Sequence, residues 1–343
     1  MSPEYGIQAF LWWKSEIAKR DLTLVQDLGF QWVKQSIAWR DIETQQKGHF
    51  EWELADNIVR RVGKRGNLKL LARIDRQPFW SQAPGTAPLD SAPPANLQDF
   101  GDFCYALADR YKGKIAAYQV WNEPNLAREW GNQLPSPEQY TELLKVCYTA
   151  IKRADPGALV ISAAMAPTGT RSADVLPDDE FVDRMYQAGA APYFDILGVN
   201  APGYKAPPEM SPDEVAARPD LGGQRFFAFR HVEDIRRIME KYGDSDKQVA
   251  ILEFGWTTDP LHPEYAWHAV TEEEQAAYLV RAYQYAYEHW SPWISIMSAL
   301  TLADPGWTPN DEQYWWAITY PDWPENRLRP AFKALQDMPK VQK

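Results

Sequence analysis

A carboxylic acid stands where a strand must end in the tetrapeptide Asn122-Glu123-Pro124-Asn125, which follows the apolar run Tyr118-Gln119-Val120-Trp121. Pro124 has no backbone N–H, so it cannot continue a β-ladder and pairing stops there. A second apolar run, Val249-Ala250-Ile251-Leu252, delivers Glu253 to a turn at Gly255. Two glutamates at two strand ends predict chemistry that uses a pair of carboxyl groups.

The elements that must position these acids alternate along the chain. Short apolar runs are each followed by an amphipathic stretch, the pattern of parallel strands covered by helices. Eight such units favour closure into an α/β (β/α)8 TIM barrel, whose active face is built by the loops after the strands. The predicted strands are residues 5–11, 32–38, 68–74, 117–121, 159–163, 195–199, 248–252 and 293–300.

Four long loops are predicted after strands 3, 6, 7 and 8, at residues 76–95, 202–223, 257–270 and 303–324. They are rich in proline, but the next element follows each of them, so we predict ordered lids. No composition shift marks a domain boundary, and 343 residues with 45% hydrophobic content suffice for one large core. The prediction is a single catalytic barrel domain over residues 1–343.

The net charge of −11 argues against a nucleic-acid or anionic-membrane partner, because phosphates would repel the chain. No window approaches the roughly eighteen apolar residues of a membrane span, so membrane insertion is not predicted. The first residues carry no signal region, although a chain that had lost an upstream leader or anchor would look the same. The compartment, including an extracellular one, and the oligomeric state stay open.

Cysteine and histidine usage predicts neither a metal nor a cofactor. Cys104 and Cys147 each fall in a helix-like stretch, so we predict free thiols in the core. The five histidines form no zinc-binding spacing.

Cleavage of a glycosidic bond requires a proton donor and either a nucleophile or a base, and the chain resembles the clan A glycoside hydrolases. Trp121-Asn122-Glu123-Pro124-Asn125 and Leu252-Glu253-Phe254-Gly255 match the two catalytic sites of that clan. Segments 29–34, 39–43 and 48–52 follow an order similar to that in family 39 and family 5 enzymes, and the resemblance covers the whole chain. It implies a TIM barrel and a retaining O-glycosidase acting on a β-linked glycan, with Glu123 as general acid/base and Glu253 as nucleophile.

The resemblance also implies roles for four polar residues. Asn122 is expected to hydrogen-bond the sugar 2-hydroxyl, and Tyr204 resembles the tyrosine that contacts the nucleophile, although its segment departs from the usual His-x-Tyr form. Lys34 stands where an arginine is often found, and lysine lacks the bidentate fork of arginine. Either Lys34 or Arg73 is expected to support Glu253, and both are predicted, with Asn122 and Tyr204, to be substrate-binding residues.

Tryptophan is abundant, with 16 residues, and many fall at strand ends or in the following loops, where a flat ring could stack on a sugar. Any single tryptophan is more often a packing residue. The predicted substrate-binding tryptophans are Trp39, Trp80, Trp121, Trp256 and Trp307.

Two other functions share these features. A transglycosidase would carry every motif, and a non-catalytic carbohydrate-binding barrel would keep the aromatic cleft without the chemistry. A metal-dependent barrel hydrolase would lack the histidines that it needs. The sugar, its linkage and the choice between endo and exo action are not readable, because fold does not settle function.

Overall fold

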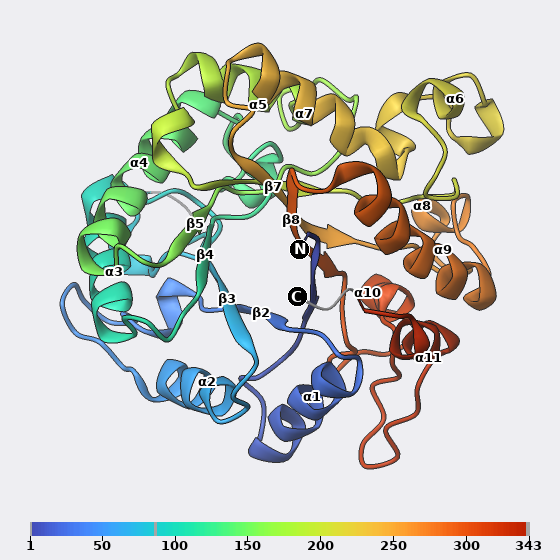
Figure 1. Ribbon diagram of the computed structural model, residues 1–343. Coiled ribbons are helices and arrows are strands. Elements are labelled where there is room, and N and C mark those ends of the chain that lie inside the picture. Colours follow the sequence, from blue (N-terminus) through green and yellow to red (C-terminus); the bar gives the residue numbers. More distant parts are fainter. Residues whose placement is uncertain (1, 86–87, 341–343) are drawn as a thin grey trace. The chain divides into compact units, whose positions relative to one another are not determined.

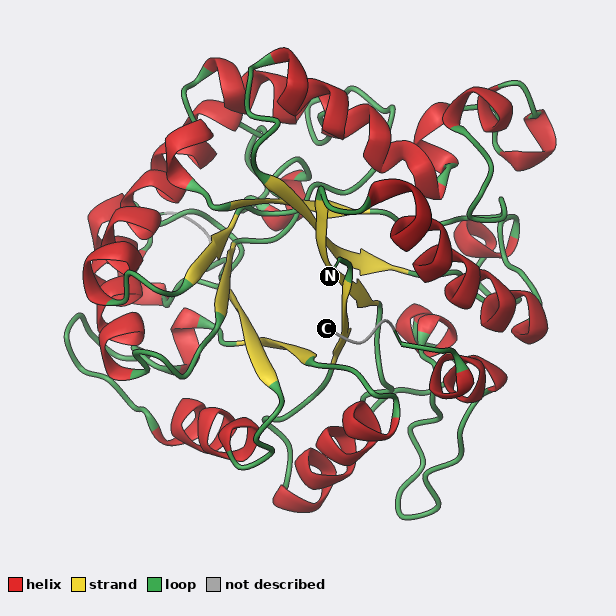
Figure 2. Cartoon of the chain, in the orientation of Figure 1, coloured by secondary structure: helices red, strands yellow, loops and turns green. Residues whose placement is uncertain are grey.

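The computed structural model describes residues 2–85 and 88–340, and its parallel strands β1 to β8 close into a barrel in chain order (Figure 1). The predicted TIM barrel is confirmed, while the predicted loop 76–95 includes residues 86–87, which lie outside the described residues. Figure 2 shows the strands in yellow and the helices in red. The strands are β1 (Glu4–Gln8), β2 (Trp32–Ser36), β3 (Lys69–Ile74), β4 (Ala117–Val120), β5 (Leu159–Ile161), β6 (Ile196–Asn200), β7 (Gln248–Phe254) and β8 (Ile294–Ala299).

The residues group into two compact units. The first unit comprises the chain up to Lys34, Val199–Arg236 and the chain from Gln248 onward, and the second comprises Gln35–Gly198 and Arg237–Lys247. Strands β2 and β6 and helix α7 (Val232–Lys241) each pass from one unit to the other. The single catalytic domain stays a prediction.

In the first unit, β1 pairs in parallel with both β2 and β8, and Ile7 lies opposite Val33 on one side and Ala299 on the other. All three side chains are fully buried, as expected for parallel strands that are covered on both faces. The helices of this unit are α1 (Ser15–Asp27), α6 (Pro212–Ala216), α8 (Pro263–Ala266), α9 (Glu272–Tyr285), α10 (Glu312–Trp316) and α11 (Pro330–Asp337).

In the second unit, β3 pairs with β4 and β4 with β5, so that the strand leading to Glu123 is paired on both sides. Two helices of this unit have side-chain N-caps: Asn96 accepts a hydrogen bond from the backbone N–H of Gln98, and Ser136 accepts one from that of Gln139. The helices of this unit are α2 (Glu53–Gly63), α3 (Leu97–Arg110), α4 (Pro137–Ala154) and α5 (Asp178–Gln187).

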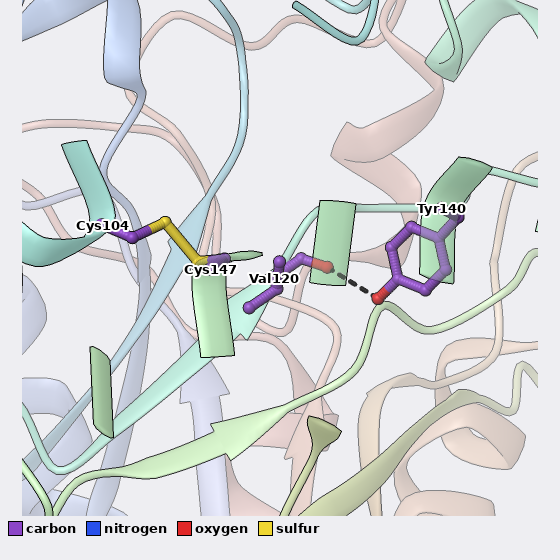
Figure 3. Close-up of a disulfide and its surroundings, with 4 residues drawn as sticks. All are labelled: Cys104, Val120, Tyr140 and Cys147. Atoms are coloured by element: carbon purple, nitrogen blue, oxygen red, sulfur yellow. Dashed lines mark hydrogen bonds between the residues drawn. A yellow bond between two sulfur atoms is a disulfide. The ribbon is translucent and has the colours of Figure 1, made fainter. Parts of the chain in front are cut away.

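The prediction of free core thiols is wrong, because Cys104 of α3 and Cys147 of α4 form a disulfide (Figure 3). The two helices pack against each other, which brings the two Cα atoms to 5.5 Å, within the range that a disulfide spans. Beside it, the Tyr140 hydroxyl donates to the Val120 carbonyl at 3.0 Å, which ties α4 to the end of β4. The cross-link and this bond both hold α4 in place next to the strand.

We predict that reduction of the disulfide lowers the free energy of unfolding by about 4 kcal/mol, because a closed loop of 43 residues restricts the unfolded chain. The measurement is chemical denaturation with and without a reductant. The Cys104→Ala/Cys147→Ala double variant is the control, since its denaturation midpoint should not respond to the reductant. Two free thiols in the denatured, unreduced wild type would contradict the prediction.

Candidate active site

The chain that follows β4 is held in an unusual backbone conformation. Trp121 and Glu123 have positive φ angles, of 73° and 44°. The Trp121 N–H donates to the carbonyl of Ile74 at 2.9 Å, and the Glu123 N–H donates to that of Ala164 at 3.0 Å. Non-glycine residues keep such conformations only where surrounding bonds fix them, often at functional sites. The backbone at Trp121 is thus anchored to the last residue of β3, and that at Glu123 to the segment that follows β5.

The Glu123 carboxyl is mostly enclosed, and the guanidinium of Arg128 is one charged group near it. Its side chain is 18% exposed, and Nη2 of Arg128 lies 3.9 Å from Oε2. The Arg128 side chain is 73% exposed, so water screens its charge strongly. This arginine therefore does little to favour the ionised form of Glu123.

The two asparagines on either side of Glu123 and Pro124 form different hydrogen bonds. Asn122 accepts a hydrogen bond at Oδ1 from Nε2 of Gln119 at 3.3 Å, which turns the amide nitrogen of Asn122 the other way. Asn125 is fully buried, donating to the Ala166 and Leu176 carbonyls and accepting from the Ala166 N–H. Asn125 thus joins the segments after β4 and β5 and has no surface for a substrate.

A third carboxyl group, which the sequence did not single out, lies in the same unit. Glu129 belongs to a short 3-10 turn after β4, and its Oε2 accepts from Nη2 of Arg76 at 2.9 Å. Burial raises the pKa of the Glu129 carboxyl, against the lowering effect of Arg76 and Arg73. No sequence motif surrounds Glu129, so only the fold could reveal that it is partly buried beside an arginine.

Glu253 is near the end of β7 in the first unit and forms an ion pair with a buried lysine. Nζ of Lys34, on β2, lies 2.6 Å from Oε1 of Glu253 and donates to the Leu252 carbonyl at 3.2 Å. The Lys34 side chain is 1% exposed, whereas that of Glu253 is 20% exposed. Lys34 is therefore a partner of Glu253, and a substrate contact by Lys34 stays a prediction.

Arg73, the other candidate for supporting Glu253, belongs to the second unit. Its Nε lies 3.0 Å from Oδ2 of Asp75, the residue that directly follows β3, so the Arg73 guanidinium forms an ion pair there. A substrate contact by Arg73 stays a prediction.

Tyr204 follows β6 on a segment that is tied to the end of β7. The Ala201 N–H donates to the Glu253 carbonyl and the Gly203 N–H to the Gly255 carbonyl, both at 2.9 Å. Tyr204 itself has a positive φ of 50°. The backbone of Tyr204 is thus fixed relative to the strand end that carries Glu253, while its contact with the Glu253 side chain stays a prediction.

The predicted tryptophans separate into two groups. Trp39, Trp121 and Trp256 are fully buried. Trp39 lies against Phe103, Trp121 against Trp130, and Trp256 against Phe229, while their indole N–H groups donate to Glu43, to the Glu129 carbonyl and to the Ala206 carbonyl respectively. The rings of these three residues pack in the interior, and a substrate contact by any of them stays a prediction. Trp80 and Trp307 are only partly buried, and a substrate contact by either stays a prediction.

Within residues 2–85 and 88–340, no group of three or more His, Cys, Asp or Glu side chains is arranged to hold a metal ion. Over the same residues, every helix is too short or too polar to cross a membrane.

The sequence matches no known family profile, and no curated protein matches it. Solved structures resemble the barrel closely. One is a family 39 glycoside hydrolase from Bacteroides cellulosilyticus WH2, at 19% identity and a TM-score of 0.69, with 97% of this chain and 63% of that chain covered. The chain thus spans less than two thirds of that enzyme.

Two further solved structures resemble this chain. GH5_18 from Streptomyces cattleya, solved with GlcNAc, gives 16% identity and a TM-score of 0.67 over 98% of this chain and 79% of that chain. Xylanase 10B from Thermotoga maritima gives 13% identity and a TM-score of 0.61 over 97% and 94%. At these identities the likeness shows the fold: this chain is similar to glycoside hydrolases built on a TIM barrel.

We predict that Gly203→Ala destabilises the protein by several kcal/mol. A Cβ at Gly203 would lie 1.9 Å from Cε2 of the Trp256 ring, which is fully buried and cannot move aside cheaply. Chemical denaturation measures the loss. Gly255→Ala is the matched control, because a Cβ there would meet Leu300 at an ordinary 3.6 Å. Equal stability of the two variants would show that Gly203 is not constrained by the tryptophan.

Proposed function

We propose that this protein is a retaining O-glycoside hydrolase that cleaves β-glycosidic bonds in an oligo- or polysaccharide by a two-glutamate double displacement. The observation that carries the proposal is the ion pair between the strand-end Glu253 and the buried ammonium of Lys34. This ammonium suits Glu253 to act as an ionised nucleophile, and Glu123, which follows the end of another strand, is the proposed proton donor.

In the first step, the Glu253 carboxylate attacks the anomeric carbon and forms a glycosyl-enzyme ester. The Glu123 carboxylic acid gives its proton to the glycosidic oxygen, so the C–O bond breaks and the leaving sugar departs as a neutral alcohol. The Lys34 ammonium keeps Glu253 ionised and oriented before the attack.

In the second step, the Glu123 carboxylate takes a proton from water, and the water oxygen attacks the same anomeric carbon. The ester bond to Glu253 breaks, and the product keeps the original configuration. We propose that the amide nitrogen of Asn122 donates to the sugar 2-hydroxyl, in line with the orientation that Gln119 gives this amide. The proposed partner is a carbohydrate, and no step requires a metal or cofactor.

The names of the structural neighbours support the reaction class. They include a glucosidase, a xylanase and a β-galactosidase, which act on different sugars. These names share the hydrolysis of a glycosidic bond. The proposal therefore names the type of bond that is cleaved, and experiment must identify the sugar.

The disulfide bears on where this reaction takes place. Protein disulfides form and persist mainly in oxidising compartments, and Cys104 is joined to Cys147. We propose that the enzyme acts outside the reducing cytosol, where polysaccharide substrates are met.

We predict that Glu253→Ala lowers kcat/KM on a reactive aryl β-glycoside by at least about a thousandfold, and that Glu123→Ala lowers kcat by a similar factor, because its glycosyl-enzyme ester lacks the base that activates water. Added azide separates the two roles. It should rescue Glu253→Ala with a product of inverted configuration, because azide attacks from the space of the missing carboxylate, and should rescue Glu123→Ala with retained configuration. The exposed residues Glu142 and Glu288 provide control variants, Glu142→Ala and Glu288→Ala, which should keep wild-type rates. Wild-type turnover by either catalytic variant would disprove its assigned role.

We also predict that Lys34→Met lowers kcat by about a hundredfold, the size expected when a fixed charge next to a reacting group is removed. Lys47→Met is the matched control. It also removes a lysine that forms ion pairs, but Lys47 is exposed and its partners are Asp99 and Asp102, not either of the two glutamates. Steady-state kinetics on the same aryl glycoside compare the two. An unchanged kcat in Lys34→Met would contradict the role given to the ion pair.

A further inference from the structure

The segment between β6 and α7 forms a small structure with its own hydrophobic core. The core consists of Ala206, Val215, Leu221 and Ala228, with Met210 and Phe227 packed against it. Helix α6 begins with a capping box, in which Ser211 and Glu214 satisfy each other's backbone N–H groups. In Figure 1 this excursion is the yellow segment labelled α6. It is therefore an ordered part of the first unit.

Packing and charge fix one ring of this segment in place. Gly222 has a positive φ of 97°, and a Cβ there would lie 2.3 Å from Cδ2 of Phe227, so the ring rests directly on the glycine backbone. Arg225, the residue two before Phe227, pairs with Asp234 of α7 at 2.7 Å. The ring of Phe227 thus projects from a rigid support.

Phe227 joins a set of rings that comes from two loops, here called the aromatic cluster: Tyr204, Phe226, Phe227, Trp267 and His268. The Phe227 ring centroid lies 4.7 Å from that of Tyr204 and 5.0 Å from that of Trp267. His268 contacts the same two rings, at 5.1 Å and 4.9 Å. Since the contacts are edge-to-face, the rings hold one another at fixed angles.

The cluster is neutral at its base. His268 is buried, and burial lowers its pKa to about 4, so the imidazole is uncharged near neutral pH. Among the described residues, Nδ1 of His268 finds no hydrogen-bond partner. An uncharged aromatic surface suits an uncharged ligand.

Packing alone does not account for Trp267, which is 40% exposed although its neighbours fix its orientation. Tyr204 and Phe226 are also only partly buried. The backbone just before Tyr204 is bonded to the end of β7, the strand that carries Glu253. A rigid, partly open and neutral aromatic surface is thus attached to the strand end that bears the proposed nucleophile.

We propose that the aromatic cluster is a sugar-binding subsite, in which the Trp267 ring stacks on an uncharged pyranose unit beyond the one that Glu253 attacks. This inference rests on the proposed function and deepens it, because it makes the substrate an uncharged oligo- or polysaccharide instead of a simple glycoside.

Two substrates test the subsite: the β-linked trisaccharide that the wild type hydrolyses fastest, and the β-glycosyl fluoride of the same sugar. The fluoride has a single-atom leaving group and one ring, so it cannot reach the cluster. We predict that Trp267→Ala lowers kcat/KM on the trisaccharide by about tenfold or more and changes that on the fluoride by less than about twofold. Trp267→Phe should recover most of the loss, since it restores a stacking ring.

Trp323→Ala is the matched control, because Trp323 is similarly exposed, at 44%, but belongs to the loop after β8. It should change neither rate. Unchanged trisaccharide kinetics in Trp267→Ala would overturn the subsite, as would an equal loss on both substrates, which would indicate a general structural defect.

Binding to an inactive variant separates this inference from the proposed function. The probe is the uncharged β-linked trisaccharide that Glu253→Gln binds most tightly by calorimetry, and Glu253→Gln/Trp267→Ala should bind it at least about tenfold more weakly. If the difference appears but the wild type hydrolyses no glycoside, the subsite stands and the hydrolase proposal fails. If hydrolysis occurs and binding is equal in the two variants, the hydrolase proposal stands and the subsite fails.

Discussion

A lysine ammonium buried away from water requires an anionic partner, and this requirement organises the end of β7. Lys34 has almost no contact with solvent, so Oε1 of Glu253 and the Leu252 carbonyl must replace its hydration. The ammonium in turn restricts where the Glu253 carboxylate can lie. Since lysine is a compact point charge, it directs its pairing at one carboxylate oxygen, whereas an arginine fork could engage both.

The two strand ends use different physical means to place a glutamate. At β7 the side chain is fixed by an ion pair, while at β4 the backbone itself is fixed, with positive φ angles at Trp121 and Glu123 and hydrogen bonds to neighbouring segments. Hydrogen bonds of this kind do not alter the charge of the Glu123 side chain. A fixed backbone suits the part proposed for Glu123, which must give and take a proton at one place.

The barrel could be predicted from the sequence because parallel strands buried on both faces appear as apolar runs, and all eight predicted runs coincide with observed strands apart from their end residues. The strand-end glutamates followed from the same reasoning. The burial of the tryptophans could not be predicted, because the direction of a side chain at a strand end depends on local backbone angles. Trp121, which has a positive φ, packs against Trp130.

The disulfide could not be predicted because residues 104 and 147 lie on separate helices, and the sequence does not say which helix faces meet. The position of Glu129 could not be predicted for a related reason, since it depends on Arg76 and on the segments around it. The disulfide and the surroundings of Glu129 depend on contacts between elements, whereas the strands were predicted from patterns within single elements.

The Cys104–Cys147 bond encloses β4, and with it Asn122 and Glu123, in a covalent ring of the chain. A protease that cut the exposed stretch around residues 132–134 would open the ring without releasing either fragment, because the sulfur bridge would still join them. The strands paired on both sides of β4 would then hold the nicked segment in register, so Glu123 would keep its place after a break in the following loop.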